Sequence, residues 1–206
     1  NFFEAIAYYS HPQTLNLINL INEGTIGEIN YIESTFGFKT KVKPHSRLFN
    51  KELGGGVILD LGCYPISFLM LFCNDYNLYK FEKIKLEHCE TNVENDAEAE
   101  LILKDKIKAK IKVSFKTHLK NNCIIQGTKG IIQISEPWLP QKKSYIEVKT
   151  QDHYYKKFTN CNLSIYANQI HNVSDFFSNK NKSKNNLFDI KKSITCMKLL
   201  ERWKEN

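Results

Sequence analysis

The 206-residue sequence predicts an α+β fold, in which an open, mainly antiparallel β-sheet carries helices packed on one face. Residues 79–158 alternate between apolar and polar side chains with a period of two, as strands do. Segments that begin near Pro12, Ser164 and Asp189 instead repeat their apolar residues at helical spacing. We find no internal repeat and no linker-like stretch, so these elements are expected to form one layered arrangement.

The first element is an apolar and aromatic segment, Phe2–Tyr9, which predicts a short buried strand. Ser10 then predicts a helix N-cap, with Pro12 in the first turn and Gln13 completing a capping box. Gly24 is placed to end this helix. The helix is expected to pack on the sheet through its leucine and isoleucine side chains.

A second strand begins after Gly27 and runs to Phe36, because this stretch is rich in β-branched and aromatic residues. The segment Lys39–Leu53 has no clear periodicity and predicts a long loop, of the kind that often carries function. Arg47 lies in this loop and is one of only two arginines in the chain. We therefore take it as a candidate contact for an anion or a substrate.

The loop leads into three consecutive glycines: Gly54, Gly55 and Gly56. Glycine can adopt positive φ and allows close approach of other groups, and the apolar run that follows predicts a buried helix. Asp60 and Tyr64 are four residues apart and would share one helical face. Pro65 lacks an N–H and disfavours helical geometry at Tyr64, so this helix is expected to be bent or to start late. The simpler alternative is a glycine turn, a first-turn aspartate and a core tyrosine.

The clearest sheet signal is a predicted hairpin around residues 104–106. If Leu103 pairs with Ile107, the same register places Glu100 beside Lys110 and Glu98 beside Lys112. The agreement between charge and hydrophobic pattern supports one buried face and one charged face. The charged face is either solvated or an oligomer interface.

A second hairpin is predicted over 122–134, around the turn Gly127-Thr128-Lys129-Gly130. A phosphate-binding loop is disfavoured, because the turn lacks the Walker spacing and is followed by a strand instead of a helix. Two more strands are predicted at Ser144–Lys149 and His153–Phe158.

Two helices are expected at Ser164–Ser178 and Asp189–Lys204, joined by a polar loop at Asn179–Asn186. His171 lies on the first and is either a satisfied, partly buried histidine or a pocket residue. The apolar side chains of both helices are predicted to point inward: Ile165, Ala167, Ile170, Val173, Phe177, Ile190, Ile194, Met197 and Leu200.

Composition disfavours several classes of function. The net charge of +7 comes almost entirely from lysine, whereas nucleic-acid recognition favours the planar arginine fork. No apolar run approaches the roughly 20 residues that cross a bilayer. The six cysteines form no CxxC pair, so no metal site is predicted, and a reducing cytoplasm is the simplest compartment.

Several motifs together resemble the Gfo/Idh/MocA oxidoreductases, a family related to glucose–fructose oxidoreductase and dimeric dihydrodiol dehydrogenase. These motifs are Glu4-Ala5, Tyr9–Gln13, Gly24–Ile29, Arg47–Pro65 and Gly127–Gly130. Family members have an N-terminal Rossmann domain that binds NAD or NADP and a C-terminal α/β domain that shapes the substrate pocket. The resemblance implies that residues 10–206 are this substrate-binding and oligomerisation domain, and that 1–9 resemble the last strand of a nucleotide-binding domain.

The resemblance also implies roles for individual residues. Tyr64 matches the tyrosine that acts as acid and base, and Asp60 matches the aspartate beside it. Arg47, His11 and His171 become substrate-binding candidates, although a histidine in a first helical turn, like His11, is more simply solvated. Two residues near the start of the chain are expected to face the cofactor: Glu4 and Tyr9. The implied reaction transfers hydride between a nicotinamide and a secondary alcohol or ketone of a sugar, sugar derivative, inositol or dihydrodiol.

Two family features are absent from these residues: a G-x-G-x-x-G motif after a strand, and the Glu-Lys-Pro motif with its active-site lysine. The 206 residues alone are therefore not expected to turn over substrate, whereas a longer protein would. The resemblance further implies a homodimer or homotetramer through the sheet face. The alternatives are a non-catalytic dimerisation or binding domain, a decayed remnant of such an enzyme and, more weakly, a basic nucleic-acid binder.

Overall fold

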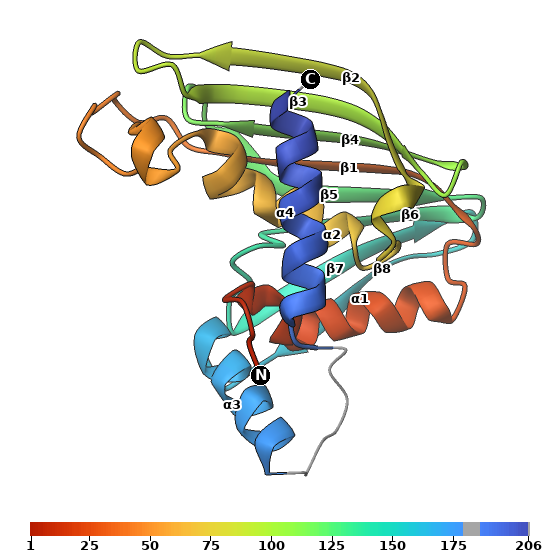
Figure 1. The fold of residues 1–206 in the computed structure, drawn as a ribbon. Coiled ribbons are helices and arrows are strands. Elements are labelled where there is room, and N and C mark those ends of the chain that lie inside the picture. The colour runs from red at the N-terminus through yellow and green to blue at the C-terminus, as the bar shows by residue number, and fades with distance from the viewer. Residues whose placement is uncertain (179–185, 206) are drawn as a thin grey trace. The chain divides into compact units, whose positions relative to one another are not determined.

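The computed structural model describes residues 1–178 and 186–205, and within them lie eight strands and four α-helices (Figure 1). The chain divides into two compact units. The first unit comprises Asn1–Asn30 and Asn122–Ile194, and the second comprises Tyr31–Asn121 and Thr195–Asn206. Each unit mixes strands and helices, as the predicted fold class requires.

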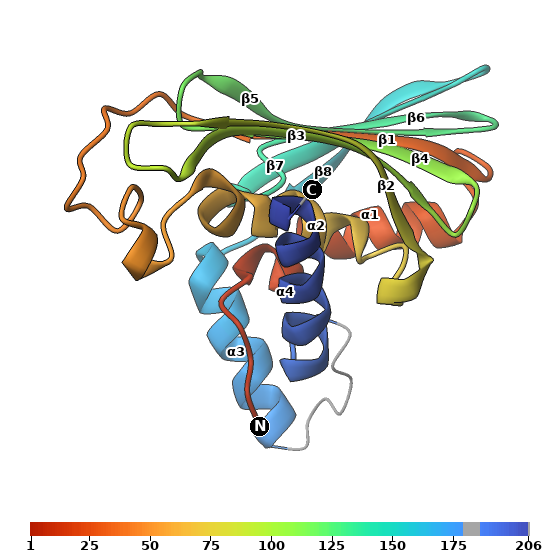
Figure 2. The same ribbon diagram turned by 45° about the horizontal axis from the view of Figure 1, so that its top comes forward.

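The strands of the second unit follow the order β2 (Tyr79–His88), β3 (Glu94–Leu103), β4 (Ile107–Ser114) and β1 (Ile29–Gly37). The pairs β2–β3 and β3–β4 are antiparallel, whereas β1 runs parallel to β4. Helix α2 (Cys63–Leu69) and the part of α4 (Ile190–Glu205) that belongs to this unit lie on one face of these strands (Figures 1 and 2). The prediction of helices on a single face is confirmed for this unit.

The predicted β3–β4 hairpin has the register that the charge pattern indicated. Leu103 pairs with Ile107, Glu100 with Lys110 and Glu98 with Lys112. The Nζ atoms of Lys110 and Lys112 lie 3.4 and 3.9 Å from the Glu98 carboxylate. On the opposite face, four alternating residues of β3 are at most 1% exposed: Ala97, Ala99, Leu101 and Leu103.

The first unit contains four antiparallel strands in chain order: β5 (Leu119–Gly127), β6 (Gly130–Ser135), β7 (Lys143–Thr150) and β8 (Tyr154–Asn160). The second predicted hairpin is confirmed, because Gln126 pairs with Ile131 across the glycine turn. Helices α1 (Pro12–Asn22) and α3 (Ile165–Phe177) complete this unit with the start of α4. Its core includes the buried rings of Tyr8 and Trp138, whose centroids are 5.5 Å apart.

The strand predicted for Phe2–Tyr9 is wrong. Only Phe3 forms an isolated β-bridge, to Asp189, and Ala7–Ser10 is a 3₁₀ turn. Tyr8 and Tyr9 are buried as predicted, whereas Phe2 is exposed, and the two tyrosine rings pack edge-on against other rings instead of lying in a sheet. A short apolar run cannot be assigned to a strand or a helical turn by periodicity alone.

The predicted Ser10 N-cap is also wrong by one residue. The cap of α1 is His11, whose Nδ1 accepts a hydrogen bond from the backbone N–H of Gln13 at 3.2 Å. The Ser10 hydroxyl instead donates to the carbonyl of Asn186 at 2.7 Å. Pro12 occupies the first turn as predicted, and Gly24 follows the end of the helix with φ of 69°.

Helices α3 and α4 lie where the sequence predicted, and Leu200 is buried at 1% exposure. Several other residues that were predicted to point inward are exposed: Ile170 (70%), Phe177 (57%), Ile194 (50%), Ile190 (47%) and Met197 (44%). Their helical spacing is correct, but no described element covers these side chains. The polar loop predicted at 179–186 lies outside the described residues except for Asn186.

Three further features concern membranes, thiols and metals. Among the described helices, none has both the length and the apolar character that crossing a bilayer demands. All six cysteines are free thiols. In the described parts of the chain, no group of three or more His, Cys, Asp or Glu side chains is arranged to hold a metal ion.

Candidate functional site

The three glycines form a tight backbone connection that disfavours larger residues. Gly54 has φ of 72° and caps the 3₁₀ turn Lys51–Leu53. A Cβ at Gly55 would lie 2.7 Å from the carbonyl oxygen of Asn50. Gly56 has φ of 120°, in the region that favours glycine. The requirement for glycine predicted at these positions agrees with this geometry.

The helix after the glycines begins irregularly, as Pro65 predicts. Residues 58–62 form a π-helical turn, and α2 follows directly. Pro65 has no N–H to offer the carbonyl of Leu61, which interrupts the regular helical ladder one turn before the proline. Single π turns are rare and occur frequently at functional sites. This turn carries Asp60, and the first turn of α2 carries Tyr64.

Arg47 and Asp60 are brought together by the loop that precedes the glycines. Arg47 Nη1 donates to Asp60 Oδ1 at 2.6 Å, and the side chains are 71% and 17% exposed. A charge-assisted hydrogen bond of this kind fixes the orientation of the carboxylate. The guanidinium has further N–H donors on its exposed side, so Arg47 can both hold Asp60 and meet a ligand.

Tyr64 is half-buried, so it is neither sealed in the core nor fully solvated. Its ring packs edge-on against Phe36 of β1, with centroids 5.3 Å apart and an interplanar angle of 87°. This contact fixes one side of the ring, because T-shaped pairs are a preferred aromatic geometry. A fully buried side chain could not exchange protons with a bound molecule, whereas part of the Tyr64 side chain is accessible.

The sequence patterns do not indicate Glu94, which lies beside this turn. It begins β3, is 4% exposed and approaches the backbone of Gly56. Simple alternation places Glu94 in phase with Glu98 and Glu100, on the charged face. The pairing of β2 and β3 contains an irregularity at Glu87/His88 that skips Asn95, and a bulge of this kind shifts the side-chain phase. The alternation of apolar and polar residues therefore does not predict that the Glu94 side chain is buried.

The two histidine candidates lie in the first unit and differ in exposure. His11 is fully buried, which contradicts the alternative of a solvated side chain. Burial lowers the pKa of His11, because the charged imidazole is poorly solvated there. The His171 side chain is 63% exposed, with Nε2 at 3.3 Å from Asp175 Oδ2, so the partly buried alternative is wrong.

The residues assigned to the cofactor also lie in the first unit. Glu4 is exposed, and its backbone carbonyl accepts a hydrogen bond from the Gln169 side chain at 2.7 Å. Tyr9 is 2% exposed, and its ring packs edge-on against Phe188 at a centroid distance of 5.0 Å. Glu4 is therefore accessible to a ligand, whereas Tyr9 serves as a core residue in this structure.

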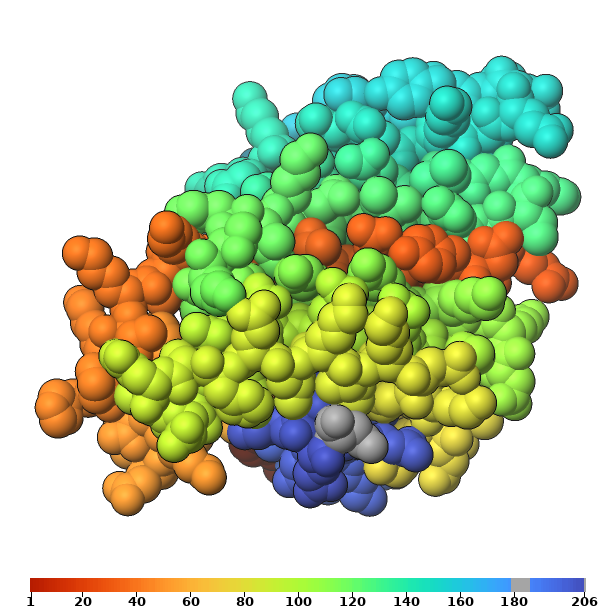
Figure 3. Space-filling model, turned by 90° about the horizontal axis from the view of Figure 1, so that it is seen from above, coloured from red at the N-terminus to blue at the C-terminus, as the bar shows by residue number. Residues whose placement is uncertain are grey.

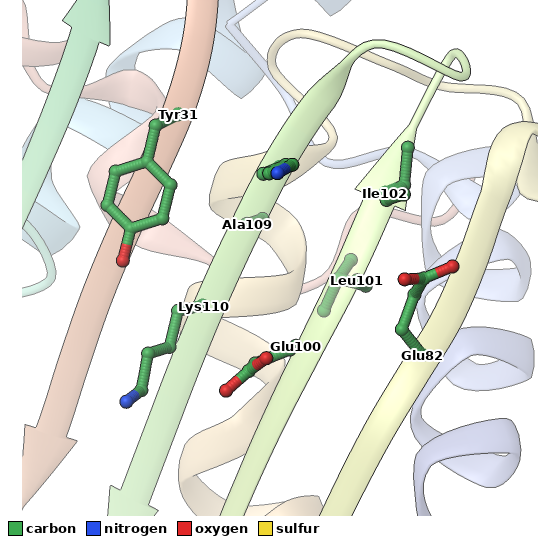
Figure 4. A pocket seen from close by; sticks show the side chains of 8 residues that line it. Tyr31, Glu82, Glu100, Leu101, Ile102, Ala109 and Lys110 are labelled. Atoms are coloured by element: carbon green, nitrogen blue, oxygen red, sulfur yellow. The ribbon is translucent and has the colours of Figure 1, made fainter.

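A hollow of about 340 Å³ lies on the charged face of the second unit. Figure 4 shows Tyr31, Lys110, Glu100 and Glu82 extending from neighbouring strands around it, and Figure 3 shows this face without a covering helix. The Tyr31 hydroxyl donates to Glu33 at 2.8 Å. Burial and the neighbouring carboxylates raise the pKa of Tyr31 to about 12. Tyr31 and Phe36 are five residues apart on β1 and face opposite sides, so the hollow lies on the face opposite Tyr64.

Sequence comparison decides the family. Residues 14–133, more than half of the chain, match the sequence model of the GFO/IDH/MocA C-terminal domain. The chain belongs to the GFO/IDH/MocA family. The family resemblance carried by the motifs of the sequence is thereby confirmed. The match identifies residues 14–133 of this GFO/IDH/MocA chain with the C-terminal domain of the family.

Curated relatives of this GFO/IDH/MocA chain include two trans-1,2-dihydrobenzene-1,2-diol dehydrogenases. The Xenopus tropicalis protein is 33% identical over 143 residues, which cover 68% of this chain and 42% of that protein. The Homo sapiens protein is 26% identical over 138 residues, covering 66% and 40%. The chain therefore spans less than half the length of these curated relatives.

Solved structures share the fold at low sequence identity. A 3-ketoreductase from Actinomadura kijaniata, in complex with NADP and TDP-benzene, matches with a TM-score of 0.82 and 21% identity over 97% of this chain and 60% of that chain. An aldose-aldose oxidoreductase from Caulobacter crescentus, complexed with glycerol, matches with a TM-score of 0.81 and 15% identity over 96% and 59%. These similarities confirm the predicted α+β class.

Proposed function

We propose that this chain is the substrate-binding and proton-transferring part of an NAD(P)-dependent oxidoreductase. The reaction moves hydride between the nicotinamide and a secondary alcohol or ketone. The observation that carries the proposal is the half-buried Tyr64 phenol, one turn after an aspartate that Arg47 holds in place. The names of the relatives, dihydrodiol dehydrogenase and 3-ketoreductase, support the same reaction class.

In this proposal, Tyr64 accepts the proton from the reacting oxygen during oxidation and donates it during reduction. Oxidation of an alcohol requires removal of the hydroxyl proton, and reduction of a ketone requires its return. An unperturbed phenol has a pKa of about 10 and needs a nearby positive charge to act as a base at neutral pH. Asp60, oriented by Arg47, accepts a hydrogen bond from the substrate or from the phenol. The nicotinamide, when bound, supplies or accepts the hydride.

The substrate class that fits is a small polyhydroxylated molecule such as a sugar, a sugar derivative, an inositol or a dihydrodiol. Arg47 presents exposed N–H donors next to the Asp60 acceptor. Donor and acceptor groups side by side match neighbouring hydroxyl groups on one ring. His11 and His171 are left out of the site, because one is fully buried and the other is exposed and paired with Asp175.

NAD or NADP would be held mainly by a nucleotide-binding domain that adjoins the first unit near residues 1–9. The apolar face of α3 supports this, because Ile170 and Phe177 are 70% and 57% exposed. The N-terminal segment runs beside α3 (Figures 1 and 2), and the Phe3 ring lies 5.5 Å from that of Phe176. Phe2 extends the apolar surface at 50% exposure. Glu4 is accessible there for a cofactor contact, whereas Tyr9 is not.

We further propose a homodimer or homotetramer through the charged sheet face of the second unit. The face alternates lysine and glutamate and contains the hollow around Tyr31. Sedimentation of the protein as a monomer would contradict this assembly. The same face is the observation that favours the alternative of a non-catalytic dimerisation domain.

A cytoplasmic location agrees with six free thiols.

The deciding experiment is Tyr64→Phe in a protein that joins this chain to its nucleotide-binding domain. Loss of an acid/base group typically costs about 10²–10⁴-fold, so we expect kcat to fall by that factor. The dissociation constants of NAD(H) and NADP(H), whichever the protein binds, should stay nearly unchanged. Tyr76→Phe, in the same unit, is the matched control and should retain activity. Near-normal turnover of Tyr64→Phe would exclude the proposed role and favour the non-catalytic alternative.

A further inference from the structure

Glu94 and Lys204 form a largely buried ion pair in the second unit. Glu94 Oε1 lies 3.3 Å from Lys204 Nζ, and the two side chains are 6% and 31% exposed. Glu94 Oε2 is buried and has no hydrogen-bond partner among the described residues. A carboxylate in such a place is costly unless a cation neutralises it, so Lys204 is required to keep Glu94 there.

The second carboxylate oxygen packs on the last of the three glycines. A Cβ at Gly56 would lie only 2.1 Å from Glu94 Oε2. Gly56 is also the start of the turn, because its carbonyl accepts a hydrogen bond from Asp60 N–H at 3.2 Å. Its own N–H donates to the carbonyl of Leu48 at 2.9 Å. The carboxylate therefore fixes the position from which the Asp60 turn departs.

The end of α4 contacts the same turn at a second point. A Cβ at Gly62 would meet Trp203 at 3.0 Å and Leu200 at 3.3 Å. Both α4 residues are at most 1% exposed. Lys204 follows Trp203 directly, so one helix end supports the turn through Gly62 and, by way of Glu94, through Gly56.

We propose that Glu94 and Lys204 are positioning residues for the turn 56–64, which carries Asp60 and Tyr64. This inference rests on the proposed function of that turn. Neither residue needs to touch the substrate, since Glu94 acts through the backbone of Gly56. Lys204 acts by holding the Glu94 carboxylate in place against the glycine.

The first test compares Glu94→Gln, Lys204→Met and the double variant in the protein that includes the nucleotide-binding domain. Small displacements of reacting groups cost large factors in rate, so each variant should lower kcat by about tenfold or more. KM and the dissociation constant of the nicotinamide cofactor, NAD(H) or NADP(H), should stay within about twofold. The double variant should be no worse than either single one, because the pair acts as a unit. Lys204→Arg should restore most of the activity. Lys116→Met is the control, since it breaks an exposed ion pair with Glu87 in the same unit.

The second test uses melting temperature and is independent of activity. Gly56→Ala and Glu94→Ala should each lower Tm, whereas the double variant should lose less than the sum, because the oxygen that opposes the new methyl group is gone. Additive losses would overturn the packing of Glu94 on Gly56. Normal kcat in Glu94→Gln and Lys204→Met, with Tyr64→Phe inactive, would overturn the positioning role and leave the proposed function intact. An active Tyr64→Phe would overturn the proposed function, and the Tm cycle would still decide the contact.

Discussion

The β3 strand of the second unit and the α3 helix of the first unit carry equally clear apolar patterns with opposite outcomes. In β3, Ala99 and Leu101 alternate with charged residues and are 1% exposed. In α3, Ile170 and Phe177 recur at helical spacing and are 70% and 57% exposed. Both faces are predicted from the sequence in the same way. Only one of them is covered by a described part of the chain.

The difference shows that periodicity identifies an apolar face without identifying what covers it. In the second unit the cover is part of the chain, namely α2 and the end of α4. In the first unit no described element covers the outer face of α3. Curated relatives are more than twice as long as the segment they share with this chain. The nucleotide-binding domain proposed above is the candidate cover for this face.

The largest expected effect separates the two faces directly. Leu101→Ala removes buried methyl groups and should cost about 2–5 kcal/mol of unfolding free energy, as large-to-small core substitutions do. Ile170→Ala removes methyl groups already in water and should change it by about 0.5 kcal/mol or less. Urea unfolding of the 206-residue chain measures both changes.

Two outcomes of that experiment bear on the comparison. If Ile170→Ala costs as much as Leu101→Ala in the isolated chain, the outer face of α3 is covered by the chain itself and the comparison fails. If its cost rises above about 1 kcal/mol only when the nucleotide-binding domain is joined to the chain, that domain is the cover.

The local features of the fold were predictable where local rules suffice. The β3–β4 register followed from charge and hydrophobic pattern together, since Glu98 and Lys112 had to be neighbours if Leu103 met Ile107. The end of α1 at Gly24 followed from glycine chemistry. The cap of α1 did not, because His11 is an uncommon cap and Ser10 is a preferred one.

The candidate site was predictable in its residues and less so in its contacts. The glycines, Asp60 and Tyr64 are contiguous in sequence, so a motif can indicate them. The Arg47–Asp60 contact depends on the path of an aperiodic loop. Glu94 is brought to Gly56 by a strand irregularity that simple alternation contradicts.

A smaller effect tests whether the first unit has a sealed core next to its uncovered face. Burial lowers the pKa of His11. As pH falls below about 6.5, the unfolded chain therefore binds a proton before the folded chain does, and stability should fall with pH in that window. His11→Asn keeps a good N-cap and removes the titrating group, so the pH dependence should flatten.

Unfolding measured from pH 7.5 to pH 5 checks this, with the exposed His45→Asn as the control. An unchanged pH dependence in His11→Asn would mean that His11 is accessible to water in both states. The claim that the first unit has a core closed to water would then be wrong. The difference in burial between β3 and the first unit would then include His11 as well as α3.

The last prediction applies the same contrast to charges within one unit, and its exposed member should show the smallest effect of all. Lys116 contacts Glu87 on the surface, with side chains 52% and 59% exposed, whereas Lys204 meets a Glu94 side chain that is only 6% exposed. Exposed pairs gain little because water and salt screen them, so Lys116→Met should leave Tm unchanged at any salt concentration. Lys204→Met strands a buried carboxylate and should lower Tm at low and high salt alike. Equal changes in Tm for the two variants would show that burial does not set the strength of these ion pairs. The dependence of stability on burial, seen for apolar side chains, would then not hold for charged ones.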